Sequence, residues 1–377
     1  MARVFVTETY GRIQRKNLFI FGHQRRRRKF VTVATVLAFT VLALDPGVVF
    51  SPVASGPRDP PMSTRMAILA ELRYPTRWYS KLFTAALAII FFGLLSTAAI
   101  SAFLVYRVVA PPRSQPGISS SDFPGHPDTV TFTVPGMGSR EGWFFPGFRG
   151  APTIILCHGY TSNRGMLLTL ASALQDHQYN VFLFDFAGHG SSGGYTTLGF
   201  RESQELRAAI DTLAQRNDVD PSRYGLWGTN LGAYAAIAEA ETDRRVRAIV
   251  VDSVYDEPSQ LVKMQIDRTG LGALPMVARW SYFGFRWLNY SYRKTPPLSE
   301  QMSRLQDVPK LFIQVLDEPR LAEVTQEMFV HAPEPREQAI LPHGDYGNML
   351  DDDKHAYETR IVNFFLLRLP PSARVIR

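Results

Sequence analysis

One short stretch of the chain places small residues around a side chain that could do chemistry. Residues 225–236 have the sequence GLWGTNLGAYAA, in which Gly228 and Gly232 flank a central Asn230. Glycines at this spacing allow a strand and a helix to approach closely at a tight turn, which exposes the central side chain. A serine there could attack a carbonyl carbon, but the amide nitrogen of asparagine has a delocalised lone pair. The spacing therefore predicts the frame of a nucleophilic turn without its nucleophile.

The segments around this turn alternate between short apolar runs and helical patterns. Continuous apolar runs of this length are typical of strands buried on both faces of a parallel sheet. They occur at 153–157, 181–185, 224–227, 246–252 and 310–316, preceded by a strand pair at 129–134 and 141–145. Apolar stripes at helical spacing lie between or after them, at 201–216 and about 353–368. The pattern predicts an α/β fold with a mostly parallel, doubly wound sheet.

Three motifs in chain order resemble the α/β-hydrolase superfamily. They are ILCHGYTSN at 155–163, FDFAGHGSSGG at 184–194 and the glycine-flanked turn at Asn230. The likeness is strongest to membrane-tethered bacterial members related to serine aminopeptidases and to acyl or thioester hydrolases. The resemblance implies an oxyanion hole, a pair of backbone N–H groups that stabilise the reacting oxygen. Its donors would be the N–H groups of Tyr160, in the loop with Gly159, and of Leu231, directly after the turn.

The resemblance also aligns three positions with a catalytic triad, in the order nucleophile, acid and histidine. The nucleophile position falls on Asn230, and the acid position on Glu318, with Asp317 as an alternate. The histidine position falls on Tyr346, with His343 as an alternate three residues earlier. A tyrosine, with a pKa near 10, is not poised to carry protons at neutral pH. Changing Asn230 to Ser and Tyr346 to His together is therefore expected to rebuild nucleophile and base.

Two functions of different classes follow from this departure. In the first, the domain is a pseudo-hydrolase that binds an acyl, ester or peptide-like ligand, or a protein partner. In the alternative, it is an active ester, thioester or amide hydrolase with a rearranged catalytic apparatus, in which Ser253 or His343 takes part. His158 is expected to orient its own turn through hydrogen bonds rather than to act as a base.

Other chemistries have no signal in the sequence. The histidines form no H-E-x-x-H motif and no close Cys/His cluster, so we expect no metal site. No phosphate-binding glycine loop opens a helix after a strand, so we expect no cofactor. The single cysteine, Cys157, excludes an intrachain disulfide and is expected to be a buried strand thiol. No basic face points to nucleic acid, and the sequence indicates no oligomeric state.

A long uncharged segment precedes the α/β pattern. Residues 82–106 contain 25 residues without a charge. A helix rising about 1.5 Å per residue over this length exceeds the roughly 30 Å of membrane hydrocarbon, so we expect a transmembrane helix. The basic residues before it favour a cytoplasmic N-terminus. The expected protein is integral to the cell membrane, with a single pass and an extracytoplasmic large domain.

An earlier apolar segment leaves this topology open. Residues 30–54 follow the basic run RRRRK at 25–29 and contain an apolar stretch that is short for a span. The stretch is either the core of a signal peptide or a weak first span that returns the domain to the cytoplasm. A third interpretation is that Met62 is the true start and residues 1–61 lie upstream of it.

Composition divides the chain into regions before and after the uncharged segment. Residues 1–81 carry fourteen Lys or Arg against four Asp or Glu, so the basic surplus lies there and the remainder is slightly acidic. Residues 107–128 form a linker rich in Pro, Ser and Gly, 129–369 the hydrolase-like domain, and 370–377 a tail. Because such a linker cannot bury a core, we expect the membrane tether to share no core with the domain.

An insertion at about 255–307 lies where the superfamily carries its lid. Its segment ARWSYFGFRWLNYSYRK, at 278–294, interleaves aromatic and basic residues. One interpretation is a helix that packs Phe283, Trp287 and Tyr290 on the domain and leaves its basic residues in solvent. The other is an aromatic and basic lid that lies near the headgroups of the membrane.

Overall fold

One sheet organises the part of the chain that the computed structural model describes, residues 77–114, 127–344 and 346–371. Its eight strands lie in the order β1-β2-β4-β3-β5-β6-β7-β8. They are β1 Asp128–Val134, β2 Gly138–Phe145, β3 Thr153–Cys157, β4 Asn180–Phe184, β5 Tyr224–Thr229, β6 Val246–Asp252, β7 Lys310–Val315 and β8 Arg336–Leu341. The pairs β1–β2 and β2–β4 are antiparallel, and every pair from β4 to β8 is parallel. The mostly parallel α/β sheet is confirmed.

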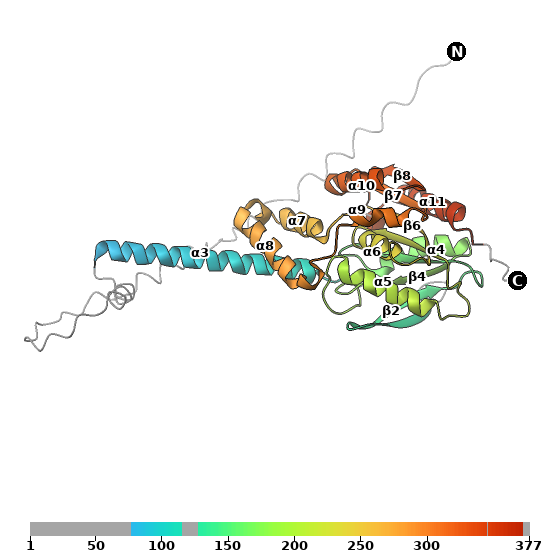
Figure 1. Ribbon diagram of the computed structural model, residues 1–377, viewed down its shortest axis with the longest axis horizontal. Helices are drawn as coiled ribbons and strands as arrows, with labels where there is room; N and C mark the ends of the chain where they lie inside the picture. Colours follow the sequence, from blue (N-terminus) through green and yellow to red (C-terminus); the bar gives the residue numbers. More distant parts are fainter. Residues whose placement is uncertain (1–76, 115–126, 345, 372–377) are drawn as a thin grey trace, which may run out of the picture. The chain divides into compact units, whose positions relative to one another are not determined.

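Helices cover both faces of this sheet (Figure 1). Side chains of α5 (Phe200–Leu213), α6 (Leu231–Ala240) and α10 (Pro319–His331) share one hydrophobic cluster, and those of α4 (Leu168–Asp176) and α11 (Asp351–Arg368) share another. Successive residues of β3 alternate between the two clusters, with Ile155 in the first and Ile154 in the second. Burial on both faces is the reason why the strand is continuously apolar. Two 3₁₀ turns, η2 (Arg164–Leu167) and η6 (Tyr346–Asn348), follow β3 and β8.

The segment between β6 and β7 is mainly helical. It comprises α7 Pro258–Arg268, η3 Leu271–Ala273, α8 Pro275–Leu288, η4 Tyr290–Tyr292, α9 Leu298–Gln301 and η5 Met302–Leu305. Helix α8 buries Val277, Ser281 and Phe285, whereas Phe283 is 64% and Trp287 is 69% exposed. The interpretation that these two aromatics and Tyr290 pack on the domain is therefore wrong. The reason is that the stripe of α8 that meets the protein carries Val277, Ser281 and Phe285, so Phe283 and Trp287 lie on another stripe of the helix.

A single helix, α3 (Trp78–Val109), carries the uncharged segment and extends beyond 82–106 at both ends. Among the described residues it is the one helix long and apolar enough to cross a membrane, by length and composition. Its last turns bury Leu104, Val105, Val108 and Val109 in the same hydrophobic cluster as α5 and α6. The expectation that the tether shares no core with the domain is therefore wrong. An uncharged helix face suits protein neighbours as well as lipid, so composition alone could not decide between them.

Several sequence-based expectations fall outside the described residues. They concern residues 1–76 of the basic region 1–81, the weak apolar segment 30–54 and the alternative start at Met62. Most of the expected linker, 115–126, also lies outside, as do residues 372–377 of the tail. Residues 107–109 of the expected linker lie in α3, and its residues 110–114 follow that helix.

Candidate functional site

The turn between β5 and α6 has the strained backbone of a nucleophilic turn. The backbone of Asn230 has φ 34° and ψ −93°, a conformation that residues other than glycine rarely adopt. Its N–H donates to the Asp252 carbonyl oxygen at 2.9 Å, and its own carbonyl accepts from the Tyr234 N–H at 2.9 Å. A Cβ atom added to Gly232 would lie 2.0 Å from the Cys157 carbonyl oxygen. The backbones approach so closely that this position requires glycine.

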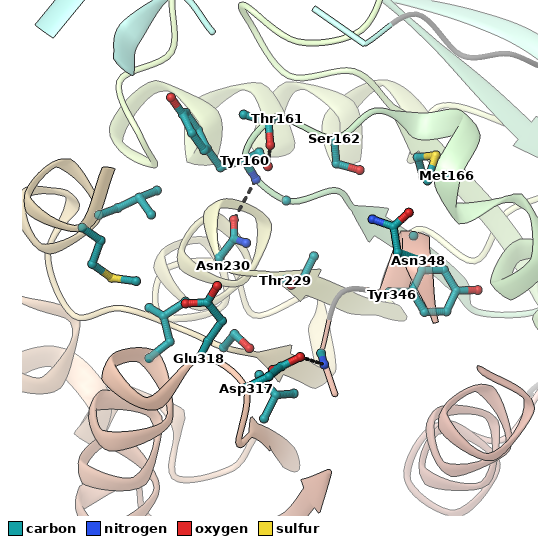
Figure 2. A pocket seen from close by; sticks show the side chains of 18 of the residues that line it. Tyr160, Thr161, Ser162, Met166, Thr229, Asn230, Asp317, Glu318, Tyr346 and Asn348 are labelled. Atoms are coloured by element: carbon teal, nitrogen blue, oxygen red, sulfur yellow. Dashed lines mark hydrogen bonds between the residues drawn. The ribbon is translucent and has the colours of Figure 1, made fainter. Parts of the chain in front are cut away.

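The side chain of Asn230 occupies the oxyanion position itself. Its Oδ1 accepts hydrogen bonds from the N–H of Tyr160 at 2.7 Å and of Leu231 at 2.6 Å. Figure 2 shows the first of these bonds. Because both partners are donors, the amide atom that faces them must be oxygen. The two N–H groups expected for an oxyanion hole do converge, but the oxygen on which they converge belongs to the protein.

The other amide atom of Asn230 is differently placed. Its Nδ2 forms no hydrogen bond within the described part of the chain, and Asn230 lines the cavity described below. A Cβ atom added to Gly159 would lie 3.1 Å from this nitrogen, so the glycine leaves the amide its space. The side chain thus closes the hole with its oxygen and keeps two N–H donors for other partners.

Tyr346, at the aligned histidine position, is held in the protein interior. Its hydroxyl hydrogen-bonds with the Thr169 hydroxyl at 2.7 Å and donates to the Glu358 carboxylate. Its ring lies edge-on to Trp227, with the ring centres 5.7 Å apart. Burial, together with Glu358, raises the pKa of Tyr346 well above its ordinary value. In Figure 2 its hydroxyl points away from Asn230, so a histidine in the same orientation would not reach residue 230. The double change expected above to rebuild nucleophile and base does not fit this geometry.

The two candidate acids follow β7 and have different partners. Glu318 forms an ion pair with Arg268 of α7. Asp317 accepts from the Gly344 N–H at 3.2 Å, and its Oδ2 lies 3.7 Å from Nδ1 of His343. His343 is 65% exposed and does not line the cavity. The structure thus places Asp317, rather than Glu318, against the loop that follows β8.

A buried carboxyl group that the sequence analysis did not single out lies behind the turn. Asp252, at the end of β6, is fully buried and accepts from the hydroxyls of Ser253 at 2.7 Å and Tyr357 at 2.6 Å. Burial raises the pKa of Asp252 to about 7, although both hydrogen bonds oppose the shift. Ser253 has φ 51° and lines the cavity. The sequence signal that could have indicated this group is an aspartate at the carboxyl end of the strand next to the turn.

His158 has the structural role expected for it. Its Nε2 accepts from the Phe186 N–H at 3.0 Å, and its Nδ1 lies 2.8 Å from the Gly159 carbonyl oxygen. This pairing requires the proton on Nδ1, and burial lowers the pKa of the ring, so the neutral form is favoured. Both nitrogens are engaged with backbone, which leaves none to act as a base. Burial likewise raises the pKa of the neighbouring Cys157 thiol, as expected of a structural cysteine.

A cavity of about 370 Å³ lies over the turn. The oxyanion loop and the turn form one side, with Tyr160, Ser162 and Asn230, and the loops after β7 and β8 form another. Helix α7 contributes Met264 and Arg268. The described residues include no group of three or more His, Cys, Asp or Glu side chains that could hold a metal ion. The cavity offers hydrogen bonds, the ion pair of Arg268 with Glu318 and the carboxylate of Asp317, but its turn offers no nucleophile.

Known proteins resemble this chain in sequence. It is 28% identical over 258 residues to the uncharacterized protein YfhR of Escherichia coli O157:H7, covering 66% of this chain and 84% of the relative. It is 35% identical over 140 residues to the uncharacterized protein Rv2307c of Mycobacterium tuberculosis (strain ATCC 25618 / H37Rv), covering 36% of this chain and 48% of the relative.

Solved structures and a family model agree with the fold. The Pyrococcus furiosus esterase Pf2001 superposes with a TM-score of 0.53 at 21% identity, covering 70% of this chain and 99% of the esterase. At that identity the likeness concerns the fold alone. The model of the Alpha/beta hydrolase family matches residues 154–362, more than half of the chain and the whole of the turn and its surrounding loops. This chain belongs to the alpha/beta hydrolase family.

Proposed function

We propose that this protein is a membrane-anchored pseudo-hydrolase that binds an acyl, ester or peptide-like ligand in the cavity over Asn230. The observation that carries the proposal is the position of Asn230 Oδ1, which accepts from both oxyanion donors at 2.6 and 2.7 Å. An enzyme of this fold needs that space for the oxygen of its substrate. Here the oxygen is supplied by the side chain that replaces the nucleophile.

Three further features support binding without hydrolysis. The amide of Asn230 cannot attack a carbonyl, and the hydroxyl of Tyr346 is engaged by Thr169 and Glu358. In a serine protease the loss of either serine or histidine lowers turnover by about 10⁶. The free N–H donors of Asn230 Nδ2 suit a carbonyl or carboxylate oxygen, which accepts hydrogen bonds but cannot donate them.

The anchor in this proposal is α3. Its apolar residues are exposed over most of the helix, including Phe91 at 61% and Ile89 at 72%, in a segment without charges from 82 to 106. Exposed apolar side chains over such a length are stabilised by hydrocarbon and destabilised by water. Basic residues before α3 favour a cytoplasmic N-terminus, so a single pass through α3 would place the large domain outside the cytoplasm.

One substitution tests ligand binding at Asn230 directly. In Asn230→Asp, one carboxylate oxygen can still accept hydrogen bonds from the N–H groups of Tyr160 and Leu231. The other oxygen takes the place of Nδ2, so a hydrogen-bond donor becomes a negatively charged acceptor. Binding of hexanoate or of N-acetylalanine, measured by calorimetry on the full chain, should weaken at least about tenfold. The conservative control is Thr229→Ser, next to Asn230 in the cavity wall, which should leave binding unchanged. Equal binding by wild type and Asn230→Asp would show that Nδ2 is not the recognition group.

A second candidate function has one observation in its favour. Asp317 and His343, after β7 and β8, lie 3.7 Å apart, as the acid and histidine of an active hydrolase would. In this alternative the catalytic groups have moved, and Ser253 in the cavity wall could serve as nucleophile.

Labelling by a fluorophosphonate and turnover of short acyl esters separate the two functions. The pseudo-hydrolase should show neither, and Asn230→Ser should label only slowly because its hydroxyl has no base. Adding Tyr346→His should not increase that labelling, since the side chain at 346 is directed away from 230. Wild-type turnover that is lost in Ser253→Ala or His343→Ala would instead establish the rearranged hydrolase.

A further inference from the structure

A second cavity lies outside the site described above, in a groove between α3 and α8. Its volume is about 660 Å³. Ala98, Ala102 and Val105 form the α3 wall, and Trp280, Phe283 and Trp287 form the α8 wall. All six side chains are apolar or aromatic, and the three aromatics remain at least 44% exposed. The groove is thus an open apolar channel rather than a filled core.

The two helices that form the groove are fixed to each other. The Ser101 hydroxyl donates to the Val277 carbonyl at 3.2 Å, and a Cβ atom added to Gly284 would lie 3.6 Å from Val105. Higher residue numbers on α3 therefore contact higher residue numbers on α8, so the two helices run in the same direction. Helix α8 lies beside the C-terminal part of α3 (Figure 1). The hydrogen bond of Ser101 and the absence of a side chain at Gly284 allow the two helices to lie close together.

One end of the groove carries a positive charge. Arg201, at the start of α5, lines the groove together with Thr197. Its Nε donates to the sulfur of Met137 at 3.0 Å. The terminal nitrogens of Arg201 have no hydrogen-bond or ion-pair partner among the residues that the structure describes. A guanidinium with free donors at the end of an apolar channel suits an anion attached to an apolar chain.

The position of the groove along α3 indicates the source of such a molecule. The part of α3 that can face lipid is shorter than the uncharged segment 82–106, because Ser101, Leu104 and Val105 are buried against the protein. Residues 78–97 lie before the groove, and twenty helical residues span about 30 Å, the thickness of membrane hydrocarbon. If these residues cross the bilayer, the groove opens at the membrane surface. Arg279 and Arg286 of α8 are exposed outside the groove lining and add positive charge to this helix, which would favour anionic headgroups.

We propose that this groove binds a single-chain anionic lipid drawn from the bilayer, with its acyl chain between α3 and α8 and its headgroup at Arg201. The inference rests on the membrane anchor of the proposed function and is independent of the chemistry at Asn230. The apolar walls supply affinity for the chain, and Arg201 supplies the preference for a negative headgroup.

Quenching of tryptophan fluorescence by brominated lipid tests the proposal on the full chain. With Trp78→Phe as the background, the exposed tryptophans are Trp280 and Trp287 in the groove wall, because Trp143 and Trp227 are buried. In phosphatidylcholine nanodiscs, chain-brominated lysophosphatidylglycerol at low mole fraction should quench them more strongly than chain-brominated lysophosphatidylcholine. Arg201→Gln should weaken the binding of the anionic lipid by about tenfold and remove this preference.

A matched pair of variants on α3 separates the groove from the surrounding membrane. Ala102→Phe fills the groove and should abolish the excess quenching, whereas Ala99→Phe, on the same helix but outside the groove lining, should not. Equal quenching by the two lipids in the parent, or an unchanged preference in both Arg201→Gln and Ala102→Phe, would overturn the proposal. Carbonate extraction tests the anchor separately. A chain that stays in the membrane without lipid preference refutes the groove alone, and a chain released by carbonate refutes the anchor on which it rests.

Discussion

The turn after β5 and the loop after β8 differ in what they retain of a hydrolase site. The turn keeps its backbone, with Asn230 at φ 34° and both oxyanion N–H groups aimed at one point. The loop keeps neither the aligned histidine nor its orientation, because Tyr346 faces Thr169 and Glu358. The backbone geometry of the turn is fixed by the close packing of its glycines. The chemistry of the loop after β8 depends instead on individual side chains, each of which can be substituted separately.

This difference explains how the turn keeps its backbone frame without a nucleophilic side chain at residue 230. The strained turn needs a side chain that satisfies two converging N–H donors, and the Asn230 amide oxygen does so from within. Substitution by an apolar residue would leave both donors without a protein partner in a partly buried position. Asparagine therefore stabilises the frame even though it cannot perform the reaction for which such frames are used.

The largest effect is expected from a change to the frame of the turn. Gly232→Ala should destabilise the protein by at least about 4 kcal/mol, because its Cβ would lie 2.0 Å from the Cys157 carbonyl oxygen. Gly193→Ala is the control, since a Cβ there meets nothing within 4 Å. Chemical denaturation of the detergent-solubilised full chain measures both. Similar stability of the two variants would mean that the turn is not fixed by close packing.

The next effect concerns Asp252, which lies between the two regions. Its pKa is raised to about 7 by burial, so the folded state favours the protonated carboxyl. The stability that this group contributes is therefore fully present below about pH 4 and is lost as the pH rises to 7. Relative to wild type, Asp252→Asn should gain of the order of 3 kcal/mol over that range, because asparagine does not ionise.

Denaturation midpoints from pH 4 to pH 8 check the prediction for Asp252. Other buried acids with raised pKa values, Glu205, Glu239 and Glu241, are common to both proteins and cancel in the difference. Tyr357→Phe removes a hydrogen bond that holds the pKa of Asp252 down and should extend the loss of stability to higher pH. A difference between wild type and Asp252→Asn that does not change with pH would contradict the assignment.

A smaller effect is expected in the loop after β8. Tyr346→Phe removes a buried hydroxyl with two partners and should cost about 1–2 kcal/mol in the free energy of unfolding. Tyr195→Phe is the matched control, because Tyr195 is 55% exposed and its hydroxyl forms no hydrogen bond within the described residues. Neither variant should change fluorophosphonate labelling. A change in labelling in Tyr346→Phe alone would give this residue a chemical role.

The sequence predicted the sheet and the turn better than the surroundings of the turn. Strands β3 and β6 begin and end at the residues that their apolar runs predicted, since burial on both faces leaves a continuous local signal. The docking of Val108 and Val109 into the domain has no such signal, because lipid and protein select the same side chains. The partner of Tyr346, Glu358, lies on the final helix, and only the tertiary structure brings the two together.

The smallest effect on stability is expected from the contact between Glu318 and α7, a helix of the lid insertion at about 255–307. Glu318 forms an ion pair with Arg268 of α7, and the two side chains are 40% and 53% exposed. Exposed pairs contribute at most about 1 kcal/mol, because water and salt screen the attraction. A double-mutant cycle of Glu318→Gln and Arg268→Gln should therefore give a coupling energy below that value, and less at high salt. A substantially larger, salt-insensitive coupling would show that this pair is shielded from solvent, as it would be if the lid closed over the loop after β7. In that case Glu318, at the aligned acid position, would have a fixed structure like the turn after β5. It would then differ from the loop after β8, which has lost the aligned histidine.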